Sequence, residues 1–176
     1  MHEVLPIVGV MGSHENEWLE YADPIGDLLA RRGYNLLTGA GDGVMTAVAR
    51  SFTQVENRKG VAIGIKPAID YKGERLSEID YPNPYIEIPM ITPLSAKAQS
   101  DAMPFSRNLV NVMTSKALVI LPGSHGTRNE DSLALMYEKP LILFGPEEAF
   151  DKFPEAPTRT TDITEVDAFL KETFEG

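Results

Sequence analysis

Short, continuous apolar runs alternate with amphipathic stretches along most of this 176-residue chain. Strands that read as uninterrupted apolar runs are typical of parallel sheets buried on both faces, whereas sheets with one wet face show polar alternation. The alternation therefore favours α/β architectures, in which strands lead into helices that cover the sheet. Residues 66–83, rich in charge and proline, are expected to be irregular. The strands are expected at residues 5–11, 34–38, 61–65, 85–88, 117–121 and 141–144.

Amphipathic segments between the expected strands predict the covering helices. The first covers residues 18–29 and stops at Gly33, and Pro24 either kinks it or begins a shorter helix capped by Asp23. Pro104 should bend or split the long helix around residues 95–115. We therefore predict an α/β fold with a Rossmann-like, doubly wound, mostly parallel sheet and helices on both faces. The remaining helices are expected at residues 43–52, at 127–137 and from 164 onward, where the spacing is that of a capping box.

Composition narrows the classes of function. The chain has no cysteine and three scattered histidines, which excludes thiol catalysis and disulfides and leads us to expect no metal site. The net charge of −10 disfavours nucleic acid and anionic membrane surfaces as partners. No apolar run approaches the roughly 20 residues that a membrane helix needs, and no signal-peptide pattern is present at the N-terminus. These features predict a cytoplasmic protein.

No repeat, low-complexity tract or linker divides the sequence, so we expect residues 1–176 to form a single Rossmann-like domain. Charge is distributed unevenly along this domain. Residues 147–176 carry nine acidic and three basic residues and are interpreted as an acidic C-terminal extension. Residues 97–130, by contrast, carry four basic and two acidic residues, so this segment can accept an anionic small molecule.

Three glycine-rich turns follow the expected strands. In a doubly wound sheet, ligands bind beyond the carboxyl ends of the strands, where such turns lead into helix N-termini. The first turn, GVMGS at residues 9–13, is weak evidence by itself, since many strands in α/β proteins end in similar tight turns. The second, GAGDGVM at residues 39–45, precedes a helix and lacks both the Walker A lysine and the dinucleotide fingerprint. The residues of these two turns that we expect to bind a ligand are Gly12, Ser13, Gly39, Gly41, Gly43 and Met45.

The third turn, PGSHGTRNE at residues 122–130, follows an apolar strand and opens a helix. Its backbone amides and hydroxyl groups, together with the helix dipole, predict a phosphate site. Glu130 falls one turn into this helix, where it either performs acid–base chemistry or stabilises the dipole. Arg107, in the preceding apolar helix, is either a surface residue or a buried anion ligand. The expected phosphate-site residues in this turn are Gly123, Ser124, Gly126 and Thr127.

These residues resemble the LONELY GUY family, whose members are often labelled "possible lysine decarboxylase" and whose wider superfamily includes molybdenum-cofactor carrier proteins. Residues 122–130 are similar to the family's P-G-G-x-G-T-x-x-E signature, and residues 39–45 to its G-G-G-x-x-G-L-M loop. Arg107 stands at the place of the arginine in the family's M-x-x-R-K motif. The resemblance spans about residues 7 to 145.

The resemblance implies a phosphoribohydrolase that cleaves a nucleoside 5′-monophosphate, of the cytokinin-riboside-monophosphate or AMP type, to free base and ribose 5-phosphate. Arg107 and Glu130 would be its catalytic pair, and no cofactor would be needed. A carboxylate near the anomeric carbon would stabilise the positive charge that develops there. Pyridoxal-phosphate lysine decarboxylation is not expected, because no lysine stands in a recognisable cofactor motif.

Three departures from the family pattern keep a second hypothesis open. Ser124 replaces a glycine, Asn108 replaces the lysine after the arginine, and Met103 lies four rather than three residues before Arg107. These changes favour the alternative of a noncatalytic protein that binds or carries a nucleotide or the molybdenum cofactor, a pterin. Under both hypotheses the partner is a small molecule, and the resemblance implies a homodimer formed through the helix at 95–115.

Overall fold

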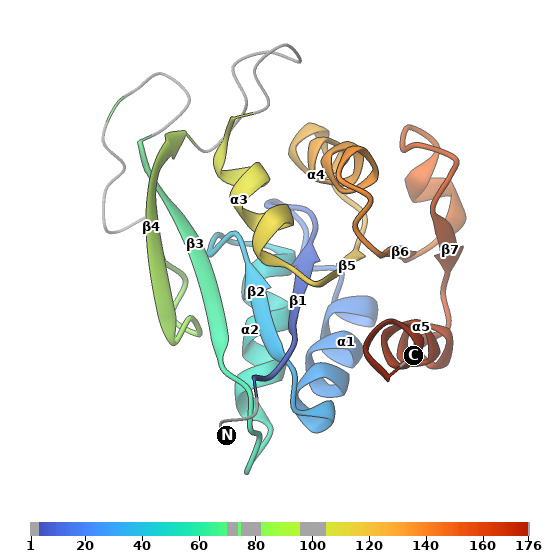
Figure 1. Ribbon diagram of the computed structural model, residues 1–176, viewed down its shortest axis with the longest axis horizontal. Coiled ribbons are helices and arrows are strands. Elements are labelled where there is room, and N and C mark those ends of the chain that lie inside the picture. Colours follow the sequence, from blue (N-terminus) through green and yellow to red (C-terminus); the bar gives the residue numbers. More distant parts are fainter. Residues whose placement is uncertain (1–3, 70–73, 75–81, 96–104, 176) are drawn as a thin grey trace.

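A computed structural model describes residues 4–69, 74, 82–95 and 105–175. These residues form a seven-stranded sheet in which every strand pairing is parallel, with helices on both faces (Figure 1). The strands are β1 (Ile7–Met11), β2 (Asn35–Thr38), β3 (Ala62–Ile69), β4 (Ile88–Ser95), β5 (Ala117–Ile120), β6 (Leu141–Phe144) and β7 (Thr158–Thr160). The helices are α1 (Leu19–Arg32), α2 (Val44–Gln54), α3 (Arg107–Thr114), α4 (His125–Met136), the 3-10 helix η1 (Glu147–Phe150) and α5 (Ile163–Glu175). The predicted α/β fold is confirmed.

The strand order is β4-β3-β2-β1-β5-β6-β7, so the chain first runs outward from β1 and then returns to its other side. In β1, Val8 pairs with Leu36 of β2 and with Ala117 of β5. The winding direction therefore reverses between β1 and β5. In open α/β sheets, the carboxyl end of such a reversal point is where a crevice for ligands forms.

Two apolar layers enclose the sheet. One contains Val8 and Val10 of β1 and packs under α1, α2 and α5. The other contains Met11 of β1 and packs under α3, α4 and η1. Because neighbouring side chains of a strand point to opposite faces, a sheet covered on both sides needs uninterrupted apolar strands. The continuous apolar runs of the sequence arise from this requirement.

Two predictions for the β4 side of the sheet differ from the structure. The irregular segment expected at 66–83 is wrong for residues 66–69, and its residues 70–73 and 75–81 lie outside the described part of the chain. β3 continues to Ile69 where the sequence indicated an irregular segment, and its pairing with β4 shifts register between Pro67 and Ile69. β4 covers Ile88–Ser95 instead of residues 85–88. It contains Pro89 and Pro93, which argue against a strand, but proline is tolerated in a strand at the edge of a sheet.

Several helix boundaries also differ from the predictions. Pro24 lies inside one helix, α1, rather than at the start of a shorter one. In the described part of the predicted 95–115 helix, α3 begins at Arg107; Met103 and Pro104 lie outside the described residues. α4 begins at His125, two residues earlier than predicted.

The C-terminal segment belongs to the sheet and is not an appendage. Its strand β7 pairs with β6, and Val166 and Leu170 of α5 are fully buried in the layer under α1. The predicted capping box at Thr164 is wrong, because Asp162 Oδ1 accepts hydrogen bonds from the amide and the hydroxyl of Thr164 at 2.8 Å each. The strand β7 has only three residues and two exposed or half-exposed positions, so it has no apolar pattern to detect.

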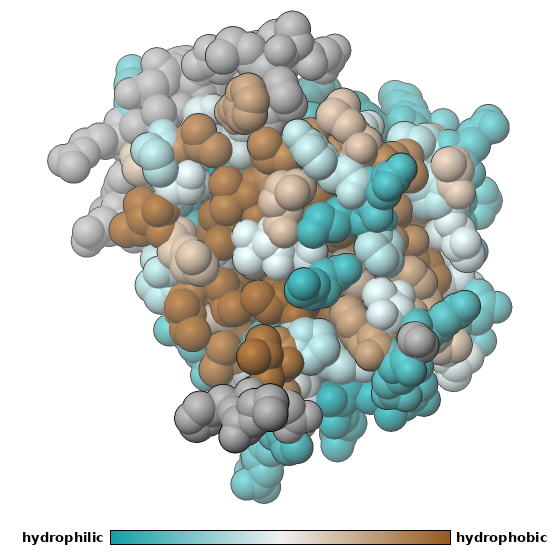
Figure 2. Space-filling view, in the orientation of Figure 1, coloured by the Kyte–Doolittle hydropathy of each residue, from teal (hydrophilic) through white to brown (hydrophobic). Residues whose placement is uncertain are grey.

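Apolar and polar residues are unevenly distributed over the surface. Figure 2 shows apolar residues gathered on the side of β3, β4 and α3, and more hydrophilic residues toward α5. The exposed apolar side chains of that side include Met90, Ile91 and Met113. The expected homodimer stays a prediction. Among the described residues, no helix has the length and apolar character needed to cross a membrane.

Candidate functional site at the carboxyl edge of the sheet

The three glycine-rich turns meet at the carboxyl edge of the sheet, at the upper side of Figure 1. The amide of Ser13, after β1, donates to the carbonyl of Pro122, after β5, at 3.0 Å. The carbonyl of Ser13 accepts from the amide of Val44, the first residue of α2, at 2.9 Å. The first turn thus joins the other two, and the expected clustering of the three turns is confirmed.

The side chain of Ser13 shapes its own turn. Its hydroxyl oxygen accepts hydrogen bonds from the amides of Glu15 at 3.1 Å and Asn16 at 3.0 Å. Gly12 packs so closely on Val44 that a Cβ there would lie 2.7 Å from the valine side chain. Both residues therefore hold the first turn against α2, and the ligand-binding role expected for them stays a prediction.

The second turn is fixed by a residue that sequence analysis missed. Asn83, which is buried, donates from Nδ2 to the carbonyl of Gly41 at 2.9 Å, and its amide donates to the carbonyl of Ala40 at 2.9 Å. The hydroxyl of Thr46 donates to the same Gly41 carbonyl at 3.0 Å. Asn83 lies 42 residues from Gly41, and the tight turn motif Pro-Asn-Pro around it was the only signal in the sequence.

Arg107 is buried at the first position of α3, with 7% of its surface exposed. Its Nη1 donates a hydrogen bond to the carbonyl oxygen of Gly39 in the second turn. The same nitrogen donates to the carbonyl oxygen of Ile65 in β3 at a distance of 3.2 Å. The surface alternative for Arg107 is therefore wrong. Its guanidinium joins α3 to the second turn. A Cβ on Gly39 would collide with this guanidinium and would lie 3.0 Å from the sulfur of Met45.

Glu130 lies at the sixth residue of α4, beyond the first turn, and is 6% exposed. The dipole-stabilising alternative is therefore wrong, since the dipole effect is confined to the first turn. Its Oε1 accepts a hydrogen bond from Asn111 Nδ2 of α3 at 2.8 Å. Burial raises the pKa of Glu130 from 4.5 to about 7, against the opposing effects of the Arg107 charge and the Asn111 hydrogen bond.

The N-terminus of α4 carries the predicted phosphate turn. Ser124 is its N-cap residue, but its side chain makes no capping hydrogen bond. Thr127 is buried, and its side chain lies where a Cβ of Gly123 would be. Gly126 faces open space, because a Cβ there would meet nothing within 4 Å. The position of Gly126 is therefore open at the start of α4, and the side chain of Ser124 does not cap the first amide groups of this helix.

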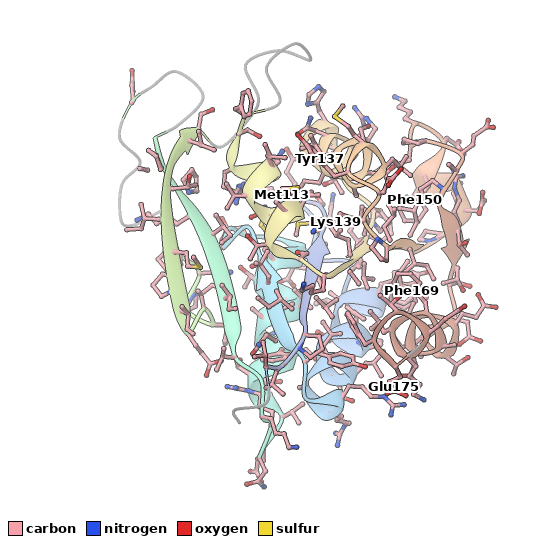
Figure 3. The ribbon with its side chains drawn as sticks, in the orientation of Figure 1. Met113, Tyr137, Lys139, Phe150, Phe169 and Glu175 are labelled. Carbon is pink, nitrogen blue, oxygen red and sulfur yellow. The ribbon has the colours of Figure 1, made fainter. Side chains whose placement is uncertain are left out.

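Helix α3 is fixed at its other end by Lys139. Its Nζ donates to the carbonyls of Met113 at 3.0 Å and Ser115 at 2.9 Å, at the C-terminus of α3 (Figure 3). Burial and the neighbouring Lys116 lower the pKa of Lys139. An ammonium group at this end of the helix is stabilised by the helix dipole. Lys139 therefore helps to hold the helix that presents Arg107 and Asn111.

Asp131 is a second buried carboxyl group on α4, and sequence analysis did not single it out. It is fully buried, and neither of its carboxylate oxygens has a hydrogen-bond partner. Burial raises its pKa from 3.8 to about 6, opposed by the charge of Arg159. Arg159 itself donates to Glu147 Oε1 at 2.8 Å and to the carbonyl of Pro154 at 3.2 Å.

This raised pKa predicts a pH-dependent stability. Below about pH 4, Asp131 is protonated in both the folded and the unfolded chain and does not change the free energy of unfolding. As the pH rises from about 4 to 6, only the unfolded chain releases the proton, so the free energy of unfolding falls. We expect Asp131→Asn to remove this fall and to be more stable than the wild type at pH 8 by on the order of 2 kcal/mol. Urea unfolding from pH 4 to 8 measures the difference.

The same substitution at the exposed Asp151 is the matched control, and it should follow the wild-type profile. Glu130 contributes equally to both chains, so the difference between their profiles isolates Asp131. If the free energies of unfolding of the wild type and Asp131→Asn changed in parallel from pH 4 to 8, ionisation of Asp131 would not destabilise the folded protein.

Among the described residues, no group of three or more His, Asp or Glu side chains is placed to hold a metal ion. Three buried polar atoms of the α3 segment lack a hydrogen-bond partner: Ser106 Oγ, Arg107 Nε and Asn111 Oδ1. Buried polar groups are almost always paired, so unpaired ones indicate places where water or a ligand completes the hydrogen bonding. These atoms adjoin the expected site.

The chain is similar to several known proteins over most of its length. The molybdenum cofactor binding protein from Rippkaea orientalis has a TM-score of 0.73 and 25% sequence identity, over 97% of this chain and 98% of that one. The molybdenum cofactor carrier protein of Chlamydomonas reinhardtii has a TM-score of 0.72 and 26% identity, over 98% and 100% of the two chains. An uncharacterized protein of Archaeoglobus fulgidus is 28% identical over 141 residues, 79% of this chain and 80% of that protein.

The LONELY GUY resemblance finds support at the level of the wider group, while membership of that family itself stays a prediction. The family profile described as SLOG cluster4 matches residues 5–170, which include all three glycine-rich turns, Arg107 and Glu130. This match covers nearly the whole chain, including the C-terminal strand and most of α5. The chain therefore belongs to the SLOG cluster4 family.

Proposed function

We propose that this protein binds a phosphorylated small molecule, a nucleotide or the molybdenum cofactor, at the carboxyl edge of its sheet and carries it without chemical change. The two solved relatives at 25% and 26% identity are a molybdenum cofactor binding protein and a molybdenum cofactor carrier protein, which supports this proposal. It takes precedence over the phosphoribohydrolase hypothesis that the sequence motifs favoured.

The observation that carries the proposal is the uncapped N-terminus of α4 beside the open space at Gly126. The first amides of a helix have no acceptor within the helix, and here the side chain of Ser124 provides none. Such amides, at the positive end of the helix dipole, bind phosphate groups.

The surroundings of Arg107 and Glu130 favour binding over hydrolysis. Nη1 of Arg107 is engaged by the carbonyls of Gly39 and Ile65, so this nitrogen holds the protein together rather than a leaving group. Glu130, with a pKa of about 7, is only partly ionised at neutral pH. A carboxyl group in either protonation state can bind a polar ligand atom, as an acceptor or as a donor.

Hydrolysis of a nucleoside 5′-monophosphate is the second candidate function. A carboxyl group with a pKa near 7 is suited to general acid–base catalysis, and the charge of Arg107 acts on Glu130 directly. Under this candidate Arg107 and Glu130 would be the catalytic pair.

One experiment separates the two candidates. The protein is incubated with a panel of nucleoside 5′-monophosphates and, separately, with isolated molybdenum cofactor, and binding is measured by calorimetry while free base and ribose 5-phosphate are assayed. We expect saturable binding of at least one compound and no release of base. Release of base that disappears in Glu130→Gln would establish the hydrolase, and failure of every compound to bind would contradict both candidates.

Substitution at Gly126 tests the position of the phosphate. A Cβ in a helix tilts toward the helix N-terminus, so the methyl group of Gly126→Ala would enter the open space in front of α4. We expect the variant to be as stable as the wild type or more stable by about 0.5 kcal/mol, because alanine favours the helix. Its affinity for the ligand should fall about tenfold, or about 1.4 kcal/mol.

The control for this prediction is Ser132→Ala, which also adds an alanine to α4 but at an exposed position. It should leave ligand affinity unchanged, and calorimetry and thermal unfolding measure both properties. Equal affinity of Gly126→Ala and the wild type would place the phosphate elsewhere.

A further inference from the structure

Helices α3 and α4 are joined by a ladder of side-chain amides. Asn108 Nδ2 donates to Asn129 Oδ1 at 3.1 Å and to the carbonyl of Gly126 at 3.4 Å. One turn further along α3, Asn111 Nδ2 donates to Glu130 Oε1 at 2.8 Å. The residue that departs from the LONELY GUY pattern, Asn108, thus contacts the phosphate turn, and Asn111 contacts the carboxyl group beside it.

We propose that Asn111 is a positioning residue of the site, whose amide holds Glu130 Oε1 and leaves Oε2 for the ligand. This inference rests on the proposed function, since it assumes that a ligand occupies this edge of the sheet. Oε2 has no hydrogen-bond partner among the described residues, although Glu130 is only 6% exposed. Unlike Asn111 Oδ1, this oxygen is not one of the fully buried atoms that lack a partner, so it is open to the site, where a ligand hydroxyl or N–H group can donate a hydrogen bond to it.

Asn111 is itself held firmly. It is fully buried, and its backbone carbonyl accepts hydrogen bonds from the amide of Ser115 at 3.2 Å and the hydroxyl of Ser115 at 2.8 Å. A buried hydrogen bond to an ionisable group contributes more than one between neutral groups. The Asn111 side chain therefore restricts the Glu130 carboxyl to one orientation.

An amide suits this role because it matches both protonation states of Glu130. Its Nδ2 donates to the carboxylate, while its Oδ1, which has no partner, can accept the proton of the neutral acid after a rotation of the amide. A leucine or methionine at position 111 could do neither. The ligand would then meet a fixed acceptor at high pH and a fixed carboxylic acid at low pH.

The electrostatic surroundings of Glu130 are simple enough to test this role. Arg107 of α3 is the charged group that acts on Glu130 among the described residues, and β5, under α4, presents buried apolar side chains. Burial raises the pKa of Glu130, and both Arg107 and Asn111 lower it. Loss of the Asn111 hydrogen bond alone should therefore shift the titration of Glu130 upward.

The first arm of the experiment needs no ligand. The full chain is labelled with carbon-13 at the glutamate carboxyl groups, and the Glu130 signal, assigned with Glu130→Gln, is titrated by NMR. We expect Asn111→Leu to raise the midpoint by about half a pH unit or more, and Asn111→Gln to restore part of the shift. Asn35→Ala removes another hydrogen-bonded asparagine, on β2, and should destabilise the protein without moving the midpoint.

The second arm uses AMP as the probe and measures its affinity by calorimetry from pH 5.5 to 8.5. Asn111→Leu should weaken binding at least about fivefold and displace the pH profile in the direction of the NMR shift. An unchanged Glu130 midpoint in Asn111→Leu would overturn the positioning role even if AMP binds. Failure of AMP to bind the wild type would contradict the nucleotide form of the proposed function, while the NMR arm would still decide the role of Asn111.

Discussion

Arg107→Ala is expected to cost about 3–5 kcal/mol of folding stability, because it leaves buried polar groups without their partner. The carbonyls of Gly39 and Ile65 lose the donor that joins the second turn to β3, and Glu130 loses the positive charge beside it. The pKa of Glu130 should therefore rise above about 7. Urea unfolding measures the stability, and calorimetry with the ligand identified from the panel should show no binding.

The control for Arg107 is Arg31→Ala. Arg31 forms an exposed ion pair with Asp27 at 2.7 Å on α1, and its loss should change stability by no more than about 0.5 kcal/mol. Arg107→Lys keeps the charge and loses the two-carbonyl contact, so it should fall between the alanine variant and the wild type. Equal stability of Arg107→Ala and Arg31→Ala would show that the second turn is held by other contacts.

Gly43→Ala should have a similarly large effect, through the backbone. Gly43 has a φ of 62° and a ψ of −130°, a conformation that residues with a Cβ rarely adopt. A Cβ there would also overlap the carbonyl of Ser13 and lie 2.7 Å from the backbone of His14. Backbone cannot move aside as a flexible side chain can, so we expect a loss of about 3 kcal/mol or more.

Gly33→Ala provides the comparison for Gly43. Gly33 also has a positive φ, 75°, but a Cβ there would be no closer than 3.6 Å to the side chain of Lys59. This variant should lose only about 1–2 kcal/mol of folding stability, because alanine is strained in the left-handed conformation. If thermal unfolding shows Gly43→Ala to be no less stable than Gly33→Ala, the contact between the first and second turns is looser than the structure indicates.

The fold was predictable where burial on both faces dictates residue type. β1, β2, β5 and β6 are fully enclosed between two layers of helices, so their sequences are continuous apolar runs and they were found within two or three residues. The edge strands β4 and β7 are less enclosed, and their residues follow no such rule. β4 can contain Pro89 and Pro93 because an edge strand has only one neighbour to pair with.

Much of the candidate site was predictable for a different reason. Glycine-rich turns after strands, and residues just inside the following helices, meet at one edge in any doubly wound sheet, so Gly39, Gly126 and Glu130 could be grouped from their sequence positions. Arg107 was expected inside a helix at 95–115 and was assigned to the site only by the family resemblance. Asn111 could also have been found, because it lies four residues after Arg107 and so shares a helix face with it. Asn83 could not, since its contact with Gly41 crosses 42 residues of chain.

The sequence by itself determined the parallel α/β sheet, the three turns and their meeting at one edge, because strand burial and chain connectivity leave few alternatives. Only the tertiary structure decided what Arg107 and Glu130 contact. Whether an arginine faces water or carbonyls, and whether a carboxyl group is ionised near pH 7, depends on burial and on partners from other elements. Those partners come together only when α3 and α4 pack side by side on the sheet. Local sequence patterns do not predict this packing.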